Sequence, residues 1–118
     1  MRAGIANEIL RAACAATVAL PLVSEAALAE RADISNHAML GKMDPDERYP
    51  FIAGIIEGIA YHRYKAGGKD SQAMNCVYDW FYDDAKAVDQ IYESFAEFPD
   101  YPPASVIDAL VSRKCGKQ

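Results

Sequence analysis

The stretch that decides the fold is residues 44–67, DPDERYPFIAGIIEGIAYHRYKAG. Asp44, followed by a proline and then by Glu47, is typical of a capping box at a helix start. Apolar residues then recur every three or four positions in one core-facing stripe: Tyr49, Ile52, Ile55, Ile56 and Ile59. A glycine pair beginning at Gly67 is a typical helix stop. We expect one long helix, with Pro50 either bending its entry or moving its start to the residue just before it.

The side of this helix away from the isoleucine stripe carries two glycines one turn apart, Gly54 and Gly58. A glycine inside a helix costs roughly 1 kcal/mol relative to alanine, so a close neighbour on that side is a plausible compensation. The pair therefore predicts a packing face. Its neighbour is either another helix of the same chain or a second protein, which includes a homodimer.

Glu57 lies on the flank between the isoleucine stripe and the two glycines, and Tyr61 follows one turn later on the same flank. A single carboxylate beside tyrosines has three possible roles. It can anchor a partner, act as a catalytic acid, or be an exposed residue bonded to a tyrosine. The sequence leaves these alternatives open, because a hydrolase with paired carboxylates needs a second one at a fixed distance.

Residues 76–84, CVYDWFYDD, have the most unusual local composition of the chain. If its other aromatic residues face the core, Tyr78 and Tyr82 lie together on another face, with Asp79 and Asp83 beside them. Tyrosines with carboxylates at a surface are typical of a protein interface or a sugar-binding patch. The alternative is a helix buried on both sides. The candidate partner-binding surface is therefore Glu57, Tyr61, Tyr78, Asp79, Tyr82 and Asp83.

Further helices are expected before and after the long one. A short helix starts near Ser35 and ends at Gly41. Residues 71–98 form either one long helix or two with a break around residues 83–84, because apolar residues recur at Ala73, Val77, Phe81, Ala85, Val88, Tyr92 and Phe95. A last helix starts at residue 103 or 104 and runs to about Cys115. No segment alternates like a strand, so the sequence predicts an all-α fold of three to five helices.

The first 29 residues have the organisation of a cleaved signal peptide. Two arginines precede an apolar run, and Ala27, Leu28 and Ala29 form an A-x-A cleavage site before Glu30. The run is shorter than a membrane span and contains Pro21. We expect export to the periplasm and one helical domain over residues 30–118.

Two of the three cysteines, Cys76 and Cys115, belong to the predicted mature domain. A cysteine pair in an exported chain predicts a disulfide, which here would tie the third helical region to the end of the last helix. In the loop-entropy account such a bridge stabilises the fold by roughly 3 to 4 kcal/mol. The alternatives are two free thiols or part of a metal site.

Charge and motifs limit the function classes. The net charge of −5 argues against nucleic acid and against an anionic membrane surface, and favours a basic protein partner. The two histidines, His37 and His62, lack further ligands at metal-binding spacing, so no metal or other cofactor is expected. No catalytic nucleophile motif, phosphate loop or dinucleotide fingerprint is present in the sequence.

The order of features resembles the Rap/Tai-type immunity proteins and their relatives. The resemblance covers about residues 44–116 and rests on the helix FIAGIIEGIAY, the cysteine after it, the helix ending FAEFP, and the terminal VSRKCG. It departs after Cys76, where YDWFYDD replaces an expected proline and glycine turn. The resemblance implies a small exported helical protein that binds and blocks a periplasmic cell-wall amidase delivered by type VI secretion, often as a dimer.

The leading hypothesis is therefore a non-enzymatic periplasmic binding protein of the immunity type. A structural or chaperone-like envelope protein is the first alternative, and it would need exposed apolar surface. A small cell-wall hydrolase using Glu57 is the second alternative.

Overall fold

The computed structural model describes residues 33–118, and within them the chain forms five α-helices and one π-helical turn without a strand. The elements are α2 (Asn36–Gly41), α3 (Pro45–Ala66), α4 (Ser71–Tyr78), the π-helical turn η1 (Asp79–Asp83), α5 (Ala87–Glu97) and α6 (Pro103–Cys115). The all-α prediction is confirmed. The expected signal peptide, residues 1–29, lies outside the described residues.

Helix α3 is the long helix expected from residues 44–67, and it starts at the predicted cap. The backbone N–H of Asp44 donates to Oε2 of Glu47 at 2.9 Å, which is one half of a capping box. Pro50 lies inside the helix, so the alternative start just before it is wrong. The glycine stop is confirmed: Gly68 takes a positive φ of 72°, and the N–H of Lys69 bonds back to the Tyr64 carbonyl at 2.9 Å.

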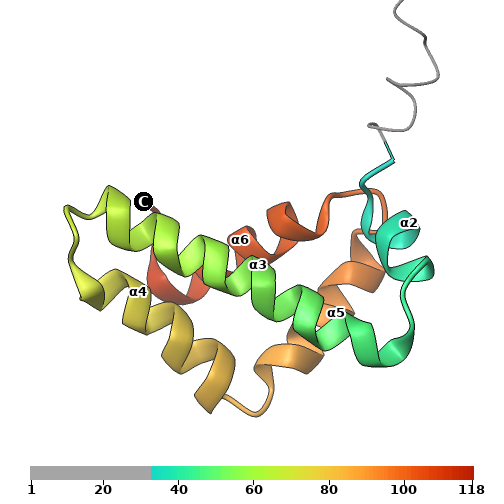
Figure 1. The fold of residues 1–118 in the computed structure, drawn as a ribbon, viewed down its shortest axis with the longest axis horizontal. Helices are drawn as coiled ribbons and strands as arrows, with labels where there is room; N and C mark the ends of the chain where they lie inside the picture. Colours follow the sequence, from blue (N-terminus) through green and yellow to red (C-terminus); the bar gives the residue numbers. More distant parts are fainter. Residues whose placement is uncertain (1–32) are drawn as a thin grey trace, which may run out of the picture.

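One face of α3 supplies the centre of the core, packed against α4 and α6 (Figure 1). Its fully buried apolar residues are Ile52, Ile56 and Ala60. Ile55 and Ile59, from the predicted stripe, are only half-buried. Tyr49 is 47% exposed, so its assignment to the core is wrong. The buried row is narrower than the apolar pattern because α4 and α6 cover only part of the helix.

Residues 71–98 form two helical segments, which selects the second of the two predicted alternatives. The break is at Asp84, whose backbone is extended, and its Oδ1 accepts the Lys86 N–H at 2.9 Å. The break resets the helical phase, since each segment then packs independently. Ala85 is consequently exposed rather than part of a continuous apolar row. The core residues of α5 are Ala87, Ile91 and Phe95.

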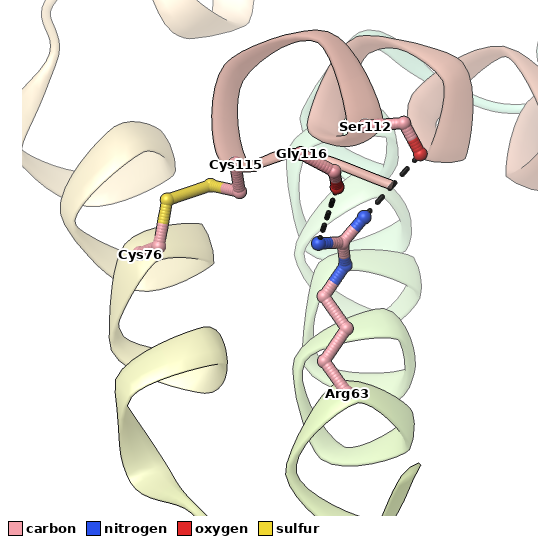
Figure 2. The surroundings of a disulfide bond; sticks show 5 residues. All are labelled: Arg63, Cys76, Ser112, Cys115 and Gly116. Atoms are coloured by element: carbon pink, nitrogen blue, oxygen red, sulfur yellow. Dashed lines mark hydrogen bonds between the residues drawn. A yellow bond between two sulfur atoms is a disulfide. The ribbon is translucent and has the colours of Figure 1, made fainter. Parts of the chain in front are cut away.

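A disulfide joins Cys76 in α4 to Cys115 at the end of α6, as predicted (Figure 2). The two Cα atoms lie 5.9 Å apart, although 39 positions separate the residues in sequence. Val106, Ile107 and Val111 bury the inner face of α6. The bridge therefore closes α4, α5 and α6 into one loop of chain around the core.

The short helix α2 is also confirmed, and it packs at the end of α5 (Figure 1). The hydroxyl of Ser35 caps it by accepting the Ala38 N–H at 3.3 Å. Asn36 is buried and donates from Nδ2 to the Phe98 carbonyl at 3.0 Å, and its own N–H bonds the Tyr101 carbonyl at 2.8 Å. These bonds hold α2 against the loop between α5 and α6.

Candidate functional site

Glu57 of α3 accepts hydrogen bonds from two tyrosines of the neighbouring segment. The Tyr78 hydroxyl donates to Oε2 at 2.7 Å, and the Tyr82 hydroxyl donates to Oε1 at 2.8 Å. Tyr78 ends α4 and Tyr82 lies in η1, with ring centroids 6.0 Å apart. The three residues, named the Glu57 cluster below, therefore present a carboxylate held at both oxygens.

The phenols of the cluster keep their protons more strongly than free tyrosine does. The hydrogen bond to Glu57 raises the pKa of Tyr82 from 10.0 to about 12, with smaller contributions from burial and from the Glu57 charge. The same causes raise the pKa of Tyr78. Both tyrosines are thus hydrogen-bond donors toward Glu57 throughout the neutral range.

Two further aromatic rings contact the cluster through Tyr82. Phe81 is buried, and its ring meets that of Tyr82 edge-on with centroids 4.9 Å apart. Tyr49 of α3 stacks on the same Phe81 ring, with centroids 5.8 Å apart. The apolar pattern predicts a core position for Tyr49, whereas its half-exposed ring extends the aromatic surface beside the Glu57 cluster.

The structure brings together only part of the candidate surface expected from the sequence. Asp79 shares a helix face with Cys76 and lines a cleft of about 610 Å³ with Lys114, so it is not part of the Glu57 cluster. Cys76 and Asp79 both line this cleft, whereas the Tyr78 and Tyr82 hydroxyls bond Glu57. Asp83 is exposed and is not hydrogen-bonded to the cluster among the described residues.

Tyr61 lies one turn beyond Glu57 and is 59% exposed. Its ring pairs with Tyr64 of the same helix, with centroids 6.4 Å apart. It therefore extends the aromatic surface of α3 without bonding the carboxylate.

Gly54 and Gly58 are exposed, and a Cβ atom added at either would meet no heavy atom within 4 Å. The intramolecular neighbour expected for this pair is therefore wrong for residues 33–118. The physical reason is that α4 and α6 pack on the opposite face of α3, which holds the buried isoleucines. The alternative, a second protein on this glycine face, stays a prediction.

Arg63 is a buried polar residue that the sequence interpretation missed. Its side chain is 3% exposed, and Figure 2 shows it reaching from α3 to the end of α6. Nη1 donates to the Gly116 carbonyl at 2.9 Å, and Nη2 donates to the Ser112 hydroxyl at 3.3 Å. Its spacing was an available signal, because Arg63 continues the buried row three residues after Ala60.

The described part of the chain contains neither a cluster of metal ligands nor a membrane-spanning helix. Residues 33–118 contain no group of three or more His, Cys, Asp or Glu side chains placed to hold a metal ion. Among the same residues, no helix is both long enough and apolar enough to cross a membrane.

No family profile, curated sequence or solved structure matches this chain.

Proposed function

We propose that the chain is a small exported protein-binding domain that uses the Glu57 cluster to hold a basic partner protein. Within that class we propose an immunity-type inhibitor of a cell-wall-degrading effector, acting in the periplasm. The observation that carries the binding proposal is the exposed Glu57 carboxylate, with one tyrosine hydroxyl on each oxygen. The immunity assignment rests on the sequence resemblance.

The chemistry of the cluster suits a cationic side chain. A carboxylate offers about four acceptor sites, and the two tyrosines occupy one on each oxygen. The remaining sites can accept from an arginine or lysine of a partner. Because Tyr78 and Tyr82 already restrain the Glu57 side chain, less rotamer freedom is lost on binding.

The surroundings also suit a protein partner. Tyr49, Tyr61 and Tyr82 are each about half exposed or more, and tyrosine is a residue type enriched at interfaces. The adjacent glycine face lets a partner backbone approach α3 closely. A net charge of −5 steers a basic protein toward the chain.

The test is affinity capture from an envelope extract, followed by titration calorimetry with the purified partner. Glu57→Gln should weaken binding about tenfold or more, because a charged hydrogen bond is lost. Glu93→Gln, an equal charge change at an exposed site on α5, should bind as the wild type does. Capture of no specific protein, or equal binding by both variants, contradicts the proposal.

The immunity assignment has its own test. The captured partner should cleave purified cell wall, and a stoichiometric amount of the chain should stop that cleavage. A partner without cell-wall activity removes the immunity assignment and leaves the binding function in place.

A further inference from the structure

A second surface lies at the C-terminal ends of α3 and α6, and its residues and charge differ from those of the Glu57 cluster. It is a cleft of about 650 Å³ lined mainly by basic and hydrogen-bond-donating side chains. The residues that matter for the argument are His62, Arg63, Asp108, Ser112, Arg113 and Lys117. We propose that this cleft binds a small oxyanion, carrying carboxylate or phosphate groups.

The charges in the cleft favour an anion. Arg63, Arg113 and Lys117 supply three permanent cations against one carboxylate, Asp108. The C-terminal ends of α3 and α6 oppose an anion as well, each with about half of a negative elementary charge. The two helix ends and Asp108 offset part of this positive charge, and the three cationic side chains still outnumber the one acidic side chain. This local excess occurs in a chain whose net charge is −5.

The hydrogen-bonding capacity points the same way. Arg63 is buried, and the two partners of its guanidinium, the Gly116 carbonyl and the Ser112 hydroxyl, are uncharged. An arginine has five N–H donors, so these two bonds use only part of the donor capacity of Arg63. Ser112 accepts from Arg63 and therefore keeps its own O–H as a donor. An oxyanion supplies the acceptors that such a donor-rich cleft requires.

The alternative explanation is that the cations only offset the two helix ends and cap the last carbonyls of α6. Arg63 performs that role for Gly116. Arg113 and Lys117 also line the open cleft, however, and Arg113 is exposed. The two explanations differ in one measurable property, which is saturable anion binding.

The experiment is an NMR titration of the full chain with inorganic phosphate and, separately, with citrate, at constant ionic strength. We expect saturable shifts of the Ser112 and Gly116 amides with at least one anion. Phosphate alone identifies a phosphate-bearing ligand, and citrate alone identifies a carboxylate-bearing one. Absence of saturable binding by both anions overturns the proposal and leaves the helix-end explanation.

Two variants and a matched control sharpen the result. The double variant Arg113→Gln, Lys117→Gln should weaken binding about tenfold or more, because two charged contacts are lost. Asp108→Asn should tighten binding, since it removes the opposing carboxylate. The control Lys42→Gln, Lys86→Gln removes two exposed cations outside the cleft and should bind as the wild type does. Equal loss in the control, or weaker binding by Asp108→Asn, overturns the proposal.

Discussion

The hydroxyl of Tyr82 lies 2.8 Å from Oε1 of Glu57, although 25 positions separate the two residues in the chain. This contact exists because the turn after Ala66 folds α4 back along α3, as Figure 1 shows. It joins a long regular helix to a π-helical turn, an element that frequently occurs at functional sites. The candidate site is therefore a product of the α3 and α4 pairing.

The first prediction concerns the ionisation of Tyr82. Glu57→Gln should lower the pKa of Tyr82 from about 12 toward 10.0, because the dominant cause of the shift is the bond to the carboxylate. Ultraviolet absorbance of the tyrosinate during an alkaline titration measures this pKa. Tyr82→Phe assigns the titration step, and Tyr101→Phe, which removes an exposed tyrosine elsewhere, should leave it in place. An unchanged high-pH step in Glu57→Gln contradicts the assignment.

The same shift predicts a dependence of stability on pH. The folded chain holds the Tyr82 proton more tightly than the unfolded chain, since the folded pKa is the higher one. The stabilisation is therefore complete below pH 10.0 and is lost as the pH rises through about 12. Urea unfolding at a series of alkaline pH values should show a shallower decline for Tyr82→Phe than for the wild type. If the free energy of unfolding falls equally with pH in the wild type and in Tyr82→Phe, the ionisation of Tyr82 is not linked to stability.

Substitutions on the glycine face should stabilise the fold of the isolated chain and weaken its association with a second protein. Gly54→Ala and Gly58→Ala should each stabilise the isolated chain by roughly 0.5 to 1 kcal/mol, because the added methyl group meets no neighbour within 4 Å and alanine favours the helix. Urea unfolding measures this gain. If the face holds a second protein, the same changes weaken that association in sedimentation experiments. If either alanine variant is less stable than the wild type at low protein concentration, the added methyl group meets another part of the same chain, which contradicts this prediction.

The disulfide should contribute a large share of the stability. Replacing both cysteines, Cys76→Ser and Cys115→Ser, should lower the free energy of unfolding by roughly 3 to 4 kcal/mol in the loop-entropy account. Urea unfolding with and without a thiol reductant measures the effect. The reductant should destabilise the wild type and leave the double variant unchanged. Equal stability of the reduced and oxidised wild type contradicts this prediction.

Arg63 is expected to stabilise the end of the α3 and α6 pair. Arg63→Leu removes both donors from the Gly116 carbonyl and the Ser112 hydroxyl, and should cost about 2 kcal/mol or more. The exposed neighbour variant His62→Gln should change the stability by less than about 0.5 kcal/mol. Urea unfolding measures the free energy of unfolding of both variants. Equal stability of the two variants contradicts a stabilising role for Arg63.

Much of the fold follows from local chemistry that the sequence displays. Asp44 and Glu47 define the start of α3, the glycines after Ala66 define its end, and Pro103 opens α6. The sequence left open whether residues 71–98 form one helix or two, because the helical spacing of apolar residues continues through the break at Asp84. Local signals suffice at these points since capping and proline effects act within one turn.

The candidate site was only partly predictable. The pairing of Tyr78 with Tyr82 follows from their separation along one segment, and Glu57 was identified as the carboxylate at the flank of α3. The position of Asp79 in the cleft with Lys114 could not be predicted, because it depends on which face of α4 meets the core. Arg63 was missed because a charged residue is rarely fully buried, and only its partners on α6 make that position favourable.

The sequence by itself determined the helical class, the helix ends and the cysteine pair, because spacing, caps and glycine stops act locally. Tertiary structure alone decided that the carboxylate of Glu57 meets two hydroxyls, that Arg63 reaches α6, and that the Gly54 side of α3 is uncovered among residues 33–118. Each of these depends on how α4 and α6 pack around α3. The helix period fixes which residues share a face, whereas only packing between helices fixes what each face meets.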